Sequence, residues 1–117
     1  MAQGAIVFRW GTPVRGREAA ALEVFAESAA YYDDLEKNHR ITSHHPYISA
    51  DRNGGLWLVC GDMAELNAIR SEEEYIRLMT KAQLIAEDFT SELCYGGTVD
   101  DLSEPMTIFG ETIGQFS

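Results

Sequence analysis

Cysteine, histidine and basic residues are scarce in this chain of 117 residues, and each shortage excludes a class of protein. The two cysteines, Cys60 and Cys94, form no Cys-x-x-Cys pair and no Cys/His cluster, so we expect no structural zinc site. Lys and Arg number 9 against 19 Asp and Glu, which gives a formal net charge of −10. Such a field repels nucleic acids and anionic membranes, and we exclude both as main partners.

Long apolar runs and a signal sequence are lacking as well. No run approaches the length that spans a bilayer, and no basic segment precedes an apolar stretch at the N-terminus, so we expect a cytoplasmic protein. The length suits one domain with one hydrophobic core. We therefore expect residues 1–117 to form a single domain whose core covers about residues 5–97.

Four segments have the composition of β-strands. The segment Leu56–Gly61 (LWLVCG) is apolar at every step, so both of its faces must be covered. Further strands are predicted at Ala5–Trp10, Ile41–Ser49 and Asp88–Tyr95. Pro46 cannot donate a hydrogen bond to a neighbouring strand, so Ile41–Ser49 should lie at an edge of the sheet.

Two segments have the periodicity of amphipathic helices. Apolar residues recur at spacings of three and four from Arg17 to about Asn38, and a short helical turn is expected at Met63–Ile69. Ser71 and Glu74 have the spacing of a capping box, which predicts that the second helix begins at Ser71. In the tail, Met106–Phe109 is a further strand candidate.

The element order is β-α-β-β-α-β, which is the ferredoxin-like α+β pattern. Right-handed crossovers then give a four-stranded antiparallel sheet of order 4-1-3-2 with both helices on one face. The other face needs a cover, so we expect a homodimer in which two sheets pack together. The tail, residues 98–117, should pack on the partner or on a sheet edge, since its apolar residues do not suit a free end.

The Asn-Gly sequence within Asp51–Gly55 predicts a tight hairpin and fixes a register. If Asn53 and Gly54 form the loop, Tyr47 pairs with Cys60 and Ile48 pairs with Val59. Trp57, Val59, Pro46 and Ile48 then face the helices, together with Ile6, Phe8 and Trp10. The opposite face, which we expect to bind a ligand between the two sheets, carries Arg9, Ser43, His45, Tyr47, Leu58, Cys60, Thr90, Glu92 and Cys94.

On that face His45 is the candidate general base, Tyr47 a hydrogen-bond donor and Arg9 an anion clamp. Structural roles compete with these: Arg9 and Glu92 can form a cross-strand ion pair, and a lone interior histidine is more often a satisfied core residue. His44 and His45 are adjacent in a strand and point to opposite faces, so they cannot form a two-histidine metal site. We expect neither a metal nor a cofactor. Cys60 and Cys94 should be free thiols because a third strand separates them.

The chain resembles the dimeric α/β-barrel superfamily over about residues 5–97, and most closely its small bacterial members without assigned activity. The resemblance rests on the element order and on four segments: Gly16–Glu18, Tyr31–Tyr32, Gly54–Asp62, and Ser71–Glu73 leading to Lys81–Leu84. Haem-degrading members need a histidine on the helix after the Trp-bearing strand, and residues 62–85 contain none. Cofactor-free quinone-forming monooxygenases rely on scattered Asn, Trp, Tyr and Arg, and stress-type members place a histidine at the sheet mouth, where His44 or His45 could correspond.

Two functions remain open at this point. The first is a homodimer that binds a small apolar or aromatic molecule between its sheets without turnover. The second is a cofactor-free monooxygenase or acid/base enzyme that uses the same cavity. A filled interior favours the first function, whereas an accessible histidine in a solvent-connected cavity favours the second.

Overall fold

The structure is a computed structural model that describes residues 2–51 and 53–116. The chain forms a four-stranded antiparallel sheet with strand order β2-β3-β1-β4, which is the expected order read from the opposite edge. β2 lies at one edge, as Pro46 predicted. The ferredoxin-like α+β fold is thereby confirmed. In chain order the elements are β1 (Gln3–Trp10), α1 (Glu18–Lys37), β2 (Ser43–Ile48), β3 (Gly55–Asp62), α2 (Met63–Arg70), α3 (Glu73–Ile85), β4 (Thr90–Tyr95), the 3-10 turn η1 (Asp100–Leu102) and α4 (Ser103–Gly114).

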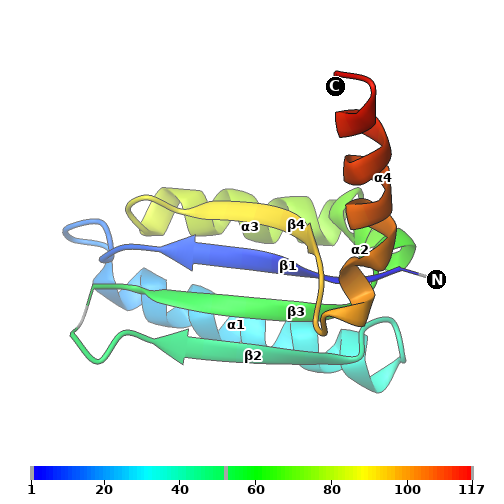
Figure 1. Cartoon of the computed structure of the whole chain (residues 1–117). Helices are drawn as coiled ribbons and strands as arrows, with labels where there is room; N and C mark the ends of the chain where they lie inside the picture. The colour runs from blue at the N-terminus through cyan, green and yellow to red at the C-terminus, as the bar shows by residue number, and fades with distance from the viewer. Residues whose placement is uncertain (1, 52, 117) are drawn as a thin grey trace.

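Helices α1 and α3 lie behind one face of the sheet, and the core fills the space between them (Figure 1). The sheet contributes Ile6 and Val59, both fully buried, and Phe8, whose ring stacks on that of Tyr32 at a centroid distance of 5.8 Å. Each such side chain stabilises the fold by about 1.5–3 kcal/mol through the apolar area that it buries. The sequence-based assignment of Ile6, Phe8 and Trp57 to the helix face is therefore correct.

The opposite face of the sheet carries no helix in the part of the chain that the structure describes (Figure 1). Its apolar side chains stay half-exposed, among them Val7, Leu56 and Leu58. Because Leu56–Gly61 is apolar at every step, we expect from the sequence that a second layer of protein covers this face. Within one copy of the chain that cover is missing.

The predicted hairpin register is wrong by four positions. Tyr47 lies opposite Leu56 rather than Cys60, and Ile48 lies opposite Gly55 rather than Val59. The reason is a longer loop, in which the amide of Ser49 donates to the carbonyl of Gly54 at 2.8 Å. Arg52, next to the predicted turn, lies outside the described residues. Because four is even, each side chain keeps the face assigned to it.

Two of the residues assigned to the helix face are not covered by the helices. Pro46 and Ile48 lie opposite Trp57 and Gly55, on the helix side of the sheet, yet both are exposed. Ile48 keeps 64 % of its surface in water because it lies at the far end of the edge strand. An edge strand contacts helices along only part of its length.

The capping box at Ser71 is not formed. Ser71 instead follows the last residue of α2, and its hydroxyl donates to the carbonyl of Asn67 at 3.4 Å. The residue before α3 is Glu72, whose side chain makes no capping hydrogen bond. The short turn expected at Met63–Ile69 is a full helix that uses Ser71 as its own C-terminal boundary, and this displaces the start of α3.

The tail contains a helix where Met106–Phe109 suggested a strand. α4 rises from the end of β4 and points away from the sheet (Figure 1), and none of its residues is buried. Met106, Ile108 and Phe109 each keep more than half of their surface exposed. Without a neighbouring strand to pair with, the backbone hydrogen bonds of this segment are satisfied locally, as a helix allows. None of the described helices combines the length and apolar content that a membrane span requires.

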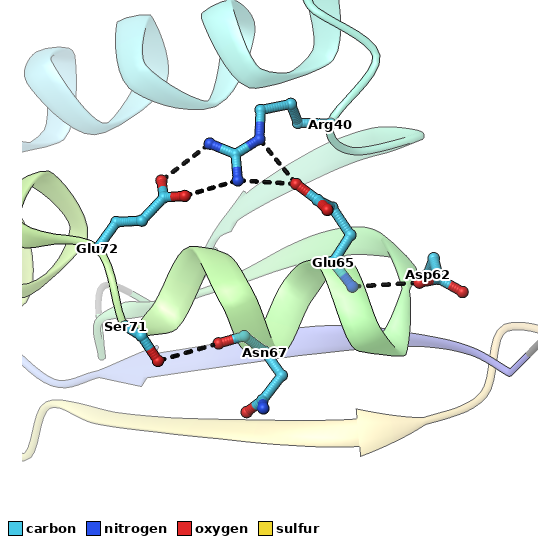
Figure 2. A network of polar contacts seen from close by, with 6 residues as sticks. All are labelled: Arg40, Asp62, Glu65, Asn67, Ser71 and Glu72. Carbon is cyan, nitrogen blue, oxygen red and sulfur yellow. Dashed lines mark hydrogen bonds and ion pairs between the residues drawn. The ribbon is translucent and has the colours of Figure 1, made fainter.

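Arg40 joins α1 to the segment around α2. Its guanidinium donates two hydrogen bonds to the Glu72 carboxylate, at 2.9 and 2.6 Å, and one from Nε to Glu65 at 2.7 Å (Figure 2). Glu65 is itself positioned by α2, because its amide donates to Asp62 at the helix N-terminus. The hydrogen bonds from Arg40 lower the pKa of Glu72 below its ordinary value. Two parallel hydrogen bonds between a guanidinium and a carboxylate are stronger and more directional than a single one.

Glu72→Gln is expected to reduce the free energy of unfolding by less than about 1 kcal/mol near neutral pH, because the pair is partly exposed to water. The folded-state pKa of Glu72 is depressed, so its stabilisation is complete above the unfolded-state pKa of about 4.3 and is lost as the pH falls through the lower folded value. Urea unfolding at several pH values measures this. Glu73→Gln, which removes an exposed pair with Arg77, is the control. Identical pH profiles for the two variants would contradict the assignment.

Candidate functional site

The strand pairing arranges the predicted ligand residues on the uncovered face of the sheet. They lie in three cross-strand rows: Thr90, Arg9, Leu56 and Tyr47; Glu92, Val7, Leu58 and His45; and Cys94, Ala5, Cys60 and Ser43. All nine residues assigned to this face therefore share it. Whether they bind a ligand stays a prediction, since one copy of the chain leaves the face open to water.

The polar groups in these rows interact weakly with one another. Nε2 of His45 lies 3.0 Å from the Ser43 hydroxyl, and both His45 and Tyr47 are exposed. Arg9 lies opposite Thr90, whereas Glu92 lies opposite Val7, and no ion pair joins Arg9 to Glu92 among the described residues. The cross-strand ion pair with Glu92, which was the structural alternative for Arg9, is therefore not formed within one copy of the chain.

Both cysteines lie on this face and both are free, as expected. β1 runs between their strands. Partial burial raises the pKa of the Cys60 thiol, an effect that a hydrogen bond with Ser43 opposes. Partial burial also raises the pKa of Cys94, with a further contribution from the charge of Glu92. Raised pKa values keep both thiols protonated near neutral pH, so neither has the character of an activated nucleophile.

An apolar pocket that the sequence did not reveal lies on the covered side, between the sheet and helices α1 and α3. It encloses about 510 Å³ of empty space, including solvent at its mouth. The strands contribute aromatic rings, and the helices contribute small or flexible residues. Its lining consists of Phe8, Trp10, Trp57 and Phe89 together with Ala21, Val24, Phe25, Ser28 and Tyr32 of α1 and Met79, Ala82, Ile85 and Ala86 around α3.

The rings around this pocket pack in contact with one another. The ring of Phe25 lies 4.8 Å from that of Trp57, and Trp10 lies edge-on to Phe25 at 6.4 Å. Tyr32 meets Trp57 edge-on at 5.2 Å. Edge-to-face and offset contacts of this kind hold aromatic rings in fixed orientations. The pocket therefore has walls suited to a flat apolar or aromatic molecule.

A hydrogen-bonded chain of three side chains fixes the orientation of Trp57. Its indole Nε1 donates to Nδ1 of His44 at 3.1 Å, and Nε2 of His44 lies 2.6 Å from the Asp33 carboxylate. Since indole is only a donor, Nδ1 must accept, which assigns the proton to Nε2. The side chain of His44 is only 11 % exposed and stacks on Trp57. The His44 ring is thus held in one orientation beside Trp57.

The sequence analysis assigned no role to Asp33 and named His44 only as a possible counterpart of the sheet-mouth histidine of stress-type members. Strand alternation correctly sends His44 to the face opposite His45, toward α1. The pairing of His44 with Asp33 depends on where α1 crosses β2, which no local pattern encodes. Within residues 2–51 and 53–116, no group of three His, Cys, Asp or Glu side chains is placed to hold a metal ion.

Comparisons with known proteins find relatives by structure only. No family model and no curated protein matches the chain. A mutant of SnoaB, a cofactor-independent oxygenase from Streptomyces nogalater, superposes with a TM-score of 0.63 at 18 % identity, over 85 % of this chain and 95 % of SnoaB. A putative antibiotic biosynthesis monooxygenase from Bacteriodes thetaiotaomicron gives 0.62 at 12 % identity, over 84 % of this chain and 90 % of the other. Rv0793 from Mycobacterium tuberculosis gives 0.54 at 14 % identity, over 83 % and 97 %.

The similarity extends over most of both chains in every pair, so it concerns the whole fold rather than one motif. At these identities it establishes the fold and not the activity. The resemblance inferred from the element order is confirmed at the level of the fold: the chain has the ferredoxin-like fold of these solved structures.

Proposed function

We propose that this protein binds a small apolar or aromatic molecule in the pocket between the sheet and helices α1 and α3. The observation that carries the proposal is the concentration of aromatic rings there. Both tryptophans of the chain, Trp10 and Trp57, line one pocket together with Phe25 and Phe89. Concave apolar sites with few polar groups are the usual form of small-molecule sites.

Two polar side chains of the pocket lining, Ser28 and Trp57, already have hydrogen-bond partners, which favours binding of an apolar molecule. The Ser28 hydroxyl donates to the Val24 carbonyl at 2.8 Å, and the Trp57 indole donates to His44. A ligand would therefore be held by contact with rings rather than by hydrogen bonds. The cavity between two sheets, predicted from the sequence, is the competing location for the ligand.

Cofactor-independent oxygenation is the second candidate function. The supporting observation is that SnoaB, which shares the fold over 85 % of this chain, is a cofactor-independent oxygenase. In such a reaction dioxygen would oxidise a bound phenol to a quinone, with one oxygen atom entering the product and the other leaving as water. His44, behind Trp57, and His45, on the uncovered face, are the histidines nearest to the two candidate cavities.

Homodimerisation through the uncovered sheet face is part of the proposal. The half-exposed row of Val7 and Leu58 gives that face an apolar centre. α4 adds Met106 and Phe109, each 60 % exposed, and a free helix of this character is unusual in a monomer. A second copy of the chain would cover both surfaces at once.

Binding is tested with 1,4-naphthoquinone, followed through quenching of the two tryptophans, both of which line the pocket. Ala21→Leu places extra carbon atoms in the pocket and is expected to weaken binding at least about tenfold, or roughly 1.4 kcal/mol. His45→Ala, on the other side of the sheet, is the matched control and should bind as the unaltered protein does. The reverse pattern would move the ligand to the cavity between two sheets.

Turnover is tested with 1-naphthol and an oxygen electrode. If the protein is an oxygenase, oxygen uptake should match the naphthoquinone formed one to one and should fall in Ala21→Leu. His44→Phe keeps a ring against Trp57 but removes both nitrogens, so it should lower turnover more than binding. If naphthoquinone binds but oxygen uptake does not exceed the protein-free rate, the oxygenase function is contradicted and only the binding function remains.

The dimer is tested by sedimentation of the full chain at micromolar concentration, with a mass twice 13.0 kDa expected. Leu58→Glu places a charge in the centre of the uncovered face, and deletion of residues 106–117 removes most of α4. Both changes should shift the chain toward the monomer. Leu22→Glu, at a 75 % exposed position on α1, is the control that should remain dimeric. A monomer in the unaltered protein would contradict the proposal.

A further inference from the structure

A polar groove lies between α2, α3 and β4, and it shares only Met79 with the lining of the aromatic pocket. It contains about 800 Å³ of empty space, including open solvent. Arg70 is its single charged residue, and the remaining lining is Asn67, Ser71, Tyr75, Ile76, Met79, Thr80, Gln83 and Ser91. Although the chain has 19 Asp and Glu, none of them lines this groove.

Arg70 is a half-buried cation without an acidic partner. Among the described basic residues only Arg40 and Arg70 are half-buried. Arg40 binds two carboxylates, whereas no carboxylate of the described residues lies within ion-pair distance of Arg70. Removing a charge from water without a counter-charge costs free energy, and an anion in the groove would offset that cost. Arg70 also lies in the last turn of α2, where a cation suits the helix dipole, so a purely structural role competes.

A second, independent feature of the groove is the hydroxyl of Tyr75. The residue is 5 % exposed, and its hydroxyl is buried without a well-formed hydrogen bond in the described structure. Burial raises the pKa of Tyr75, and contacts with the nearby Ser91 hydroxyl and Arg70 guanidinium oppose that rise. Tyr75, Ser91 and Arg70 therefore converge from three different elements. Because a guanidinium can only donate, an acceptor in the groove would complete the hydrogen bonding of the buried phenol.

The direction of the neighbouring side chains fits a site separate from the Arg40 ion pairs. Figure 2 shows the amide of Asn67 projecting from the side of α2 opposite to Glu65, away from Arg40. α2 thus presents Glu65 toward Arg40 on one side and the neutral Asn67 toward the groove on the other. Ile76 and Met79 supply the apolar part of the groove.

We propose that this groove binds a small monocarboxylate, with the carboxylate between Arg70, Ser91 and the Tyr75 hydroxyl and the apolar part of the ligand against Ile76 and Met79. A single guanidinium balances a single negative charge, which favours a carboxylate over a doubly charged phosphate. Guanidinium and hydroxyl donors match the two oxygens of a carboxylate, and such charge-assisted hydrogen bonds are strong. The site does not depend on the aromatic pocket or on the proposed function.

The test is a titration of the full chain with benzoate, followed by NMR of the arginine Nε–H and backbone amide signals. Saturable shifts of the Arg70 Nε–H and of amides near Ser71 and Ser91 are expected. Arg70→Gln should weaken binding at least about tenfold, the loss of one charge-assisted hydrogen bond. Arg77→Gln, an exposed arginine paired with Glu73, is the matched control and should bind as before.

Tyr75→Phe removes only the phenol oxygen and keeps the packing of the ring, so it separates binding from folding. It should weaken benzoate binding several-fold while the tryptophan signal of naphthoquinone binding stays unchanged. Inorganic phosphate is the second ligand, and tighter binding of phosphate than of benzoate would overturn the carboxylate assignment. Unchanged benzoate affinity in both Arg70→Gln and Tyr75→Phe, or the absence of saturable shifts, would overturn the site itself.

Discussion

Alternation along four antiparallel strands sends one set of side chains under helices α1 and α3 and the other set to an uncovered face. Trp57 belongs to the first set, and its neighbours along the strand, Leu56 and Leu58, belong to the second. The first set forms the core and the aromatic pocket, and its rings fix one another. The second set mixes apolar and polar groups and has no cover within the chain. The sheet therefore separates two candidate sites that share no side chain.

Much of the fold follows from periodicity. The long apolar stripe before Asn38 and the unbroken apolar run Leu56–Gly61 identify a helix and a central strand, and the element order then determines the sheet order. The hairpin shows how a local error can leave a global conclusion intact. A loop that is longer by four residues, all on the β2 side, moves the pairing of Tyr47 by four positions, but His45 and Tyr47 keep their face because side chains alternate with a period of two.

The missed features depend on contacts between elements far apart in the sequence. No sequence pattern pointed to Asp33, because a helix position says nothing about the strand that the helix crosses, and that crossing brings its carboxylate to His44. The aromatic pocket exists because Phe25 and Met79, on two helices, leave space above Trp57. In the tail, strand-forming residues such as Ile108 adopt a helix because no strand is available to pair with them. The expectation of a strand rested on the β-propensity of these residues, whereas the structure depends on which neighbouring elements they can pair with.

Charge is distributed unevenly around α2, and this bears on where a ligand can lie. Its N-terminal half carries Glu65, which together with Glu72 forms ion pairs with Arg40, so the charges on that side of the helix are paired. The opposite side ends in Arg70, whose surroundings are hydroxyls, amides and the buried phenol of Tyr75. A fold that only needed a cation for the helix dipole could leave that cation in full contact with water. Partial burial of Arg70 without a carboxylate beside it therefore favours the proposed anion site over a purely structural role.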